Sequence, residues 1–202
     1  MLISHISGLF THPDSEWDEI KKEHSSPIKM YSYIGLLAAI GPLCAYYATT
    51  QLGWRVGDGQ LIMLSSSSAM VLTAMSYLAV VVGVYIVGIM IDWMSKTYGS
   101  GHDEMAANGI SLAAYSSTPL FLAGFVALYP EPWLSVLVYL VAAAYAGYLM
   151  YDGLPHVLGI PKDQAFFFNG AILTFALVYI VVTMVGTVII WSVGYGPEFI
   201  SG

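Results

Sequence analysis

The amino-acid sequence predicts an all-α, polytopic membrane protein with five transmembrane helices and a short N-terminal amphipathic helix. The first observation is composition, since 57% of the 202 residues are hydrophobic and only 9% are charged. Soluble domains have about 25% charged residues. The second observation is length, because a helix needs roughly 20 apolar residues to cross a bilayer. Five apolar runs meet this condition, at residues 31–50, 69–93, 107–129, 133–151 and 166–191.

Aromatic side chains are the third observation, because tyrosines and tryptophans gather at the ends of the runs. Such rings prefer the depth of the lipid headgroups. Inside the hydrocarbon, a helix satisfies its own backbone polar groups, so helices are the expected spanning elements. The chain therefore divides into an N-terminal segment at 1–30, a five-span membrane domain at 31–192 and a short tail at 193–202.

The N-terminal segment carries apolar residues at three- and four-residue steps, which places them on one helical face. Pro13 is expected to divide this helix, with Thr11 or His12 capping the second piece. The opposite face is acidic. We expect the segment to lie at the cytoplasmic membrane surface, and docking of a partner protein is the alternative. The apolar face consists of Leu2, Ile6, Leu9, Pro13, Trp17 and Ile20, and the opposite face of Asp14, Asp18, Glu19, Lys22 and Glu23.

Proline interrupts the first and third runs near their middles. A proline removes one helical hydrogen bond and frees the carbonyls before it. We favour simple bends in which neighbouring hydroxyls satisfy those carbonyls. The alternative is a small-molecule or lipid pocket between the two helices, as at broken transporter helices. The residues of this candidate pocket are Pro42, Ser116, Ser117, Thr118 and Pro119.

Small and polar residues form stripes on the second, fourth and fifth runs, where they allow close helix contact. Packing within one bundle is the expectation, and self-association is the alternative. The stripes are Ser66, Ala69, Thr73, Ser76 and Gly83, then Ala142, Ala143, Ala146 and Gly147, then Thr183, Gly186 and Thr187. Cys44 is the only cysteine, which excludes an intramolecular disulfide and a paired-cysteine zinc site.

The distribution of cations predicts the topology. With the N-terminus in the cytoplasm, five spans place five of the six cations there and leave one outside. The positive-inside rule therefore favours a cytoplasmic N-terminus and a periplasmic C-terminal tail. No signal peptide is evident, so the first run is expected to act as an uncleaved insertion signal. The cytoplasmic cations are Lys21, Lys22, Lys29, Lys96 and Lys162, and the outer one is Arg55.

Only a few polar groups in or near the spans suggest a binding, metal or proton site. Asp92 and Asp152 lie at the cytoplasmic ends of their runs, and His156 follows Asp152 by four residues. Gly153 and Pro155 make a continuous helical face there doubtful. We interpret these groups, with His12 and Asp14, as a polar interface and keep a metal or proton site as the lesser alternative.

The sequence shows neither a nucleophile with a facing base nor paired zinc ligands on a helix, which a membrane protease needs. No histidine lies inside a run. No enzyme activity, cofactor or nucleic-acid partner is therefore expected.

Several stretches, in loops and breaks as well as in the spans, carry a family resemblance. The stretches are 8–14 (GLFTHPD), 49–54 (TTQLGW) with 57–59 (GDG), 118–124 (TPLFLAG) with 126–130 (VALYP), and 147–151 (GYLMY). They resemble the bacterial YohC-like branch of the YIP (Ypt/Rab-interacting protein) superfamily of membrane proteins. The resemblance implies five spans with a cytoplasmic N-terminus and no catalytic residue. Eukaryotic relatives organise vesicle traffic and bind Rab-type GTPases, but they have a longer soluble N-terminal region, so GTPase binding is not carried over.

The sequence thus favours a non-enzymatic inner-membrane protein that binds or organises lipids or other membrane proteins. Membrane lipids are the expected partners, with other membrane proteins or a second copy of the chain as further candidates. The competing function is a small transporter or channel with a pocket between the proline-broken first and third helices.

Overall fold

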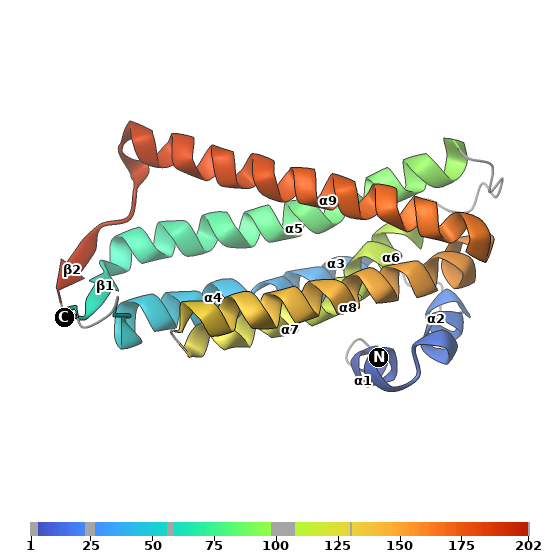
Figure 1. Cartoon of the computed structure of the whole chain (residues 1–202), viewed down its shortest axis with the longest axis horizontal. Coiled ribbons are helices and arrows are strands. Elements are labelled where there is room, and N and C mark those ends of the chain that lie inside the picture. The colour runs from blue at the N-terminus through green and yellow to red at the C-terminus, as the bar shows by residue number, and fades with distance from the viewer. Residues whose placement is uncertain (1–3, 23–26, 56–58, 98–107, 130, 202) are drawn as a thin grey trace.

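Five helical spans make up most of the molecule, as predicted. The computed structural model describes residues 4–22, 27–55, 59–97, 108–129 and 131–201. Leu2 and Glu23 of the predicted amphipathic helix and Ala107 at the start of the third run lie outside these residues. The spans are Ile28–Leu52, Ser66–Lys96, Gly109–Leu128, Pro132–Leu158 and Lys162–Tyr195, each long and apolar enough to cross a membrane. Figure 1 shows them side by side along the long axis.

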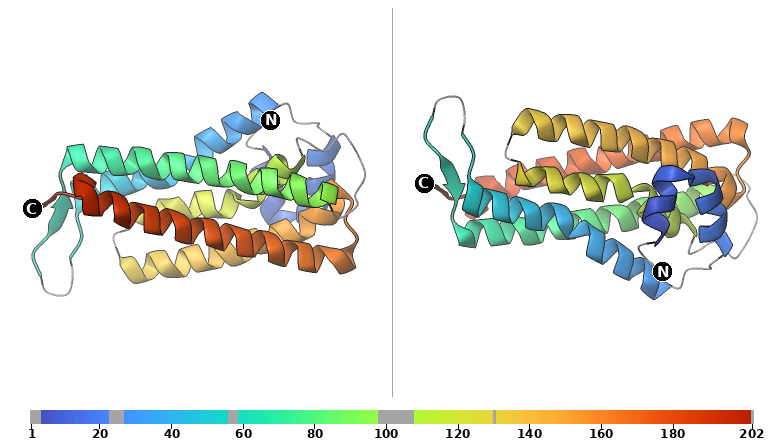
Figure 2. Two further views of the ribbon diagram at one scale, coloured as in Figure 1. Left: turned by 90° about the horizontal axis from the view of Figure 1, so that it is seen from above. Right: turned by 90° about the horizontal axis from the view of Figure 1, so that it is seen from below.

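The first and third spans are interrupted, as the prolines predicted. The first consists of α3 (Pro27–Ala38), α4 (Ile40–Tyr47) and η1 (Ala48–Leu52), and the third of α6 (Asn108–Ser116), α7 (Thr118–Ala123) and η3 (Gly124–Leu128). Each proline lies in the first turn of the helix after the break, where its missing N–H costs least. The change of direction between α3 and α4 is visible in Figure 2.

The remaining spans are long single helices. They are α5 (Ser66–Thr97), α8 (Pro132–Leu158) and α9 (Lys162–Ile190), and α9 continues into η4 (Trp191–Tyr195). The expected interruption near Gly153 and Pro155 was wrong, because α8 continues to Leu158. Pro155 lies in the last turn, and Gly159, with φ of 66°, ends the helix in the left-handed conformation. That conformation suits glycine.

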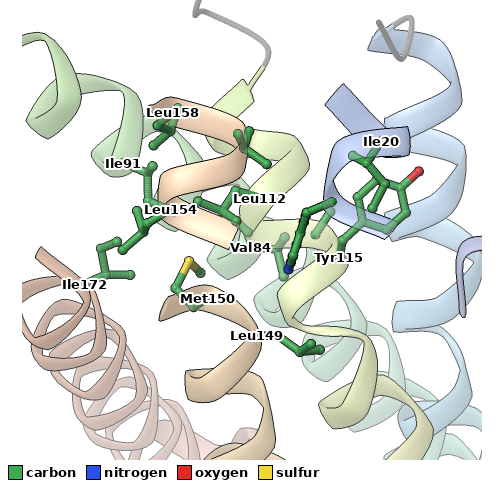
Figure 3. Close-up of a cluster of buried hydrophobic side chains, with 14 of the residues drawn as sticks. Ile20, Val84, Ile91, Leu112, Tyr115, Leu149, Met150, Leu154, Leu158 and Ile172 are labelled. Atoms are coloured by element: carbon green, nitrogen blue, oxygen red, sulfur yellow. The ribbon is translucent and has the colours of Figure 1, made fainter. Parts of the chain in front are cut away.

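The core lies around the third span. Of the most apolar stretch of each span, 61% is buried in the third and only 6% in the fifth. Leu112 of α6 and Leu149 and Leu154 of α8 are fully buried and belong to one cluster. Figure 3 shows this cluster where α5, α6, α8 and α2 approach one another. The fifth span is peripheral and contacts α5 and α8.

Two short helices, α1 (Ser4–Thr11) and α2 (Pro13–Lys22), precede the bundle and are divided before Pro13 as predicted. Their apolar face packs on the bundle, where Leu9, Trp17 and Ile20 are buried. The position of the two helices at the membrane surface stays a prediction. Trp17 has no exposed surface, and an ideal Cβ at Gly153 would lie 2.8 Å from its Cε2 atom. The Tyr145 hydroxyl donates to the Leu9 carbonyl at 2.8 Å, which ties α1 to α8.

A small antiparallel sheet, which the sequence did not predict, lies at the opposite end of the bundle. Strand β1 (Ile62–Leu64) pairs with β2 (Phe199–Ser201), with Met63 opposite Ile200. The Ser65 N–H donates to the Glu198 carbonyl at 2.9 Å. The sheet therefore joins the C-terminal tail to the loop after the first span, and we call this end the β1–β2 end (Figure 1).

Candidate functional site

The first and third spans, which carry the predicted mid-membrane pocket residues, make one very close contact. An ideal Cβ at Gly124 would lie only 2.5 Å from the Cα atom of Gly41. These two glycines therefore let the backbones of α4 and η3 approach closely, as small residues do in membrane helices. Pro42 is buried next to Gly41, and Pro119 is buried five residues before Gly124.

The hydroxyl groups of the predicted pocket residues mostly have partners within the protein. The hydroxyls of Tyr33 and Thr118 share a buried hydrogen bond of 2.6 Å. Ser117 donates to the Ala113 carbonyl at 2.7 Å. Ser116 is buried, and its Oγ atom has no partner among the described residues. Ligand binding at these five predicted residues stays a prediction.

A cavity of about 330 Å³ lies between the same helices but nearer the β1–β2 end. It begins about one turn beyond the glycine pair, where Ala45 and Ala48 of the first span face Ala127 of the third. Because these side chains are single methyl groups, the separating helices leave space between them. The cavity is lined by Ala45, Ala48, Thr49, Gly53, Trp54, Ala127, Tyr129, Glu131, Pro132 and Ser135. The alanines at 45, 48 and 127 were the sequence signal that could have located it.

The lining is apolar on the helices and polar at the end of the spans. Among the described residues of the lining, Glu131 alone is charged. It precedes Pro132, the first residue of α8, but makes no side-chain capping hydrogen bond. Thr49 donates to the Ala45 carbonyl at 2.8 Å, so its oxygen can still accept. The arrangement can hold a mainly apolar molecule with one cationic or hydrogen-bonding end.

Trp54 is positioned at the cavity by the small sheet. Its backbone exchanges hydrogen bonds with Ile62, of 3.0 and 2.9 Å. Its ring meets Phe199 of β2 edge to face, with 6.1 Å between the ring centres. The C-terminal strand therefore supports one wall of a cavity formed by the first, third and fourth spans.

The predicted polar interface is partly assembled at the other end of the bundle. One ligand atom each from Asp14, Asp152 and His156 lies within 4.8 Å of the others. The continuous α8 places Asp152 and His156 on one face, since residues four apart are neighbours on a helix. Asp14 comes from α2. Structural zinc sites have four protein ligands and calcium sites six or more oxygen ligands, whereas the described residues supply three to this group. A metal site there stays the lesser alternative.

His156 also contacts Asp18 of α2. Its Nδ1 atom lies 3.0 Å from the Asp18 carboxylate and donates a hydrogen bond to it. That bond is the main reason why the pKa of Asp18 is lowered from its ordinary value of 3.8. Asp152 contributes a buried oxygen, Oδ2, without a partner among the described residues. These groups attach α2 to α8.

The other two predicted interface residues lie elsewhere. Asp92 is buried at the end of α5 and accepts a hydrogen bond of 2.9 Å from the Gly109 N–H, which joins α5 to α6. His12 is exposed between α1 and α2, and its carbonyl accepts from the Ser15 hydroxyl at 3.0 Å.

Comparison with known proteins identifies the family. The family model described as the Yip1 domain matches residues 7–185. The chain belongs to the Yip1 family. It is 39% identical over 194 residues to the inner membrane protein YohC of Escherichia coli strain K12, covering 96% of this chain and 98% of that protein. The same values hold for YohC of Escherichia coli O6:H1. No solved structure matches the chain.

Membership of the Yip1 family confirms the resemblance seen in the sequence, and the five spans make this chain an integral inner-membrane protein. Two of the stretches that carried the resemblance, 49–54 and 126–130, contribute to the cavity. They supply Thr49, Gly53, Trp54, Ala127 and Tyr129 to its lining. Part of the resemblance to the Yip1 family therefore lies in residues that form the cavity.

Proposed function

We propose that this Yip1-family protein binds membrane lipid in the cavity at the β1–β2 end and organises its surroundings without catalysing a reaction. The observation that carries the proposal is the cavity of about 330 Å³ between the first, third and fourth spans. Its volume lies at the lower end of the range for small-ligand pockets. It therefore suits a lipid headgroup or a segment of one acyl chain rather than a whole lipid.

The composition of the lining supports binding rather than catalysis. Alanine makes up half of the lining residues that belong to helices, and the described lining contains no histidine or cysteine. A hydroxyl nucleophile such as Ser135 needs a base within hydrogen-bond reach, and the lining offers only Glu131, at the opening turn of α8. Close approach of Gly41 and Gly124 at the inner end of the cavity favours a binding site over a channel along these helices.

Filling the cavity tests this function. Ala45→Leu and Ala127→Leu each add three carbon atoms to its wall, so both variants should co-purify with less lipid than the wild type. Native mass spectrometry of protein in the same detergent measures bound lipid. Ala143→Leu is the matched control, because Ala143 is an exposed alanine of α8 outside the cavity. Equal bound lipid in all four proteins, with equal melting temperatures, would reject the proposal.

A flux assay distinguishes lipid binding from the competing function, a small transporter or channel. Wild-type protein in sealed liposomes should not increase the passage of small ions or metabolites. Protein-dependent flux that Ala127→Leu blocks would instead favour a transporter or channel.

A further inference from the structure

We propose that the cavity at the β1–β2 end selects a phospholipid with an ammonium headgroup, which Glu131, Trp54 and Tyr129 recognise. The inference rests on the proposed lipid binding and adds the chemical class of the ligand. Three properties of the site support it: its charge, its aromatic groups and its position at the end of the spans.

The charge of the lining favours a cation. Glu131 is the only charged residue among the described lining residues, and no described cation lies within ion-pair distance of its carboxylate. Its backbone is already engaged, because its N–H donates to the Tyr129 carbonyl at 2.7 Å and its carbonyl accepts from the Ser135 N–H at 3.2 Å. The backbone of Glu131 is thus fixed, and its exposed side chain has no hydrogen-bond or ion-pair partner in the described part of the chain. An anionic headgroup would be repelled there, whereas an ammonium group would be attracted.

Two aromatic residues reinforce this preference. Trp54 and Tyr129 belong to the same lining as Glu131. The faces of tryptophan and tyrosine attract ammonium groups, and the attraction increases where water is excluded. The edge-to-face contact with Phe199 and the backbone bonds to Ile62 fix the position of Trp54. A carboxylate and two rings are therefore brought together from two separate connections of the chain, one after the first span and one after the third.

The depth of the site indicates a lipid rather than a free amine. The aromatic and acidic residues follow or precede the spans, which is where headgroups lie. The alanines Ala45, Ala48 and Ala127 continue from this polar mouth toward the bundle interior. A headgroup at the mouth thus places the apolar part of the same lipid against alanine walls. Ser135 adds a hydroxyl that can donate to the phosphate of that lipid.

A competition between headgroups tests the inference. Protein is reconstituted in nanodiscs with equal amounts of ethanolamine and glycerol phospholipids that have identical acyl chains, and retained lipids are counted by native mass spectrometry. Wild type should retain the ethanolamine lipid with a preference of roughly fivefold, as expected for a partly exposed ion pair with cation–π support. Glu131→Gln should reduce this preference to about one, while the total of bound lipid stays nearly constant.

Arg55→Gln is the matched control, because Arg55 is an exposed charge next to Trp54 that does not line the cavity. It should keep the wild-type preference. No headgroup preference in the wild type, or an equal preference in Glu131→Gln, would overturn the inference while leaving lipid binding intact. Failure of the alanine-to-leucine variants to reduce bound lipid would instead overturn the proposed function.

Competition with soluble ethanolamine distinguishes a lipid headgroup from a free amine as the source of the ammonium group. At millimolar concentration ethanolamine should not displace the bound lipid, because it lacks the apolar part that contacts the alanines. Displacement by ethanolamine alone would contradict a lipid as the ligand.

Discussion

At the scale of single residues, glycines decide where helices of this protein touch. Gly41 and Gly124 bring two backbones together, and Gly153 accommodates the indole of Trp17. Any side chain at these positions would occupy space that a neighbour already fills. The small residues therefore define both the closed inner end of the cavity and the attachment of the N-terminal helices.

Gly153→Ala should detach α2 from the bundle. The new Cβ would lie 2.4 Å from Cδ1 of Leu112 and 2.8 Å from Cε2 of Trp17, so both side chains must move. Overpacking of this kind costs about 1–3 kcal/mol. A lower melting temperature and faster thiol labelling of Ile20→Cys, measured after Cys44→Ala, check the result.

Gly170→Ala is the control for that change, because an ideal Cβ at Gly170 meets nothing within 4 Å. It should leave labelling unchanged and can raise helix stability by up to about 1 kcal/mol. Equal behaviour of the two variants would show that the Trp17 contact does not hold α2.

The bond between His156 and Asp18 predicts a pH dependence. Because the pKa of Asp18 is lowered in the folded protein, its contribution to docking of α2 is present above the ordinary aspartate value and is lost as pH falls through the lowered value. Asp14, Asp152, Lys21 and Lys22 lie near the same pair.

His156→Gln should therefore raise the pKa of Asp18 toward 3.8. Carboxyl NMR of carbon-13-labelled aspartate in detergent measures this value, with Asp18→Asn identifying the signal. An unchanged Asp18 titration in the histidine variant would contradict the assigned contact.

At the scale of elements, hydropathy and proline placement predicted most of the fold. The spans follow from uninterrupted apolar length, and the breaks before Pro42 and Pro119 follow from the missing N–H of proline. The strands β1 and β2 were not predicted, because each has three residues and its partner lies more than 130 positions away. The continuation of α8 past Pro155 was also not predicted. Pro155 lies in the last turn, so few helical residues follow it and the helix is little disturbed.

The candidate sites were predicted less completely than the helices. Asp152 and His156 share a face of α8 that the sequence had made doubtful because of Gly153 and Pro155. The approach of Asp14 depends on how α2 packs on α8. The cavity was expected between the first and third spans, whereas its described lining lies about one turn or more from the prolines. Apolar length alone does not show where two helices separate, and the alanines at 45, 48 and 127 acquire this meaning only once the packing of the two helices is known.

Phe199→Ala tests whether the C-terminal strand supports the cavity. Loss of the edge-to-face contact should free the ring of Trp54 and weaken lipid retention by roughly two- to tenfold, the range for an aromatic pair. Native mass spectrometry of bound lipid is the measurement. Tyr195→Ala is the control, because this exposed aromatic residue of the same tail does not line the cavity. Equal losses in both variants would indicate a general effect of the tail.

At the scale of the whole molecule, burial is unequal among helices of similar composition. The third span lies inside the bundle and the fifth lies at its edge. Lipid is as apolar as leucine, so hydrophobicity does not distinguish an inner from an outer helix in a membrane. The sequence could therefore predict the number of spans but not which of them would be central.

Charge distribution over the whole molecule supports one orientation in the membrane. The five spans place the two ends of the chain at opposite ends of the bundle (Figure 1). Lys21 and Lys22 of α2, Lys96 near the end of α5 and Lys162 at the start of α9 share one end of the bundle. Arg55 follows the first span at the other end. We propose that the lysine-rich end faces the cytoplasm, because translocation of positive charge is disfavoured.

Reporter fusions test this orientation. A reporter joined at Gly202 should be periplasmic and one joined at Gly101 cytoplasmic, each assayed with alkaline phosphatase and a fluorescent protein.

Replacing Lys21, Lys22 and Lys29 with glutamine leaves two cations at the cytoplasmic end and Arg55 at the other end. Part of the protein should then insert in the reverse orientation, so that both alkaline phosphatase and the fluorescent protein are active when joined at Gly202. The same three replacements combined with Arg55→Gln should restore much of the original orientation, because the two remaining lysines are then unopposed. Reporters at Gly101 and Gly202 on one side of the membrane would contradict the five-span arrangement itself, whereas reversed but opposite locations would contradict only the assigned direction.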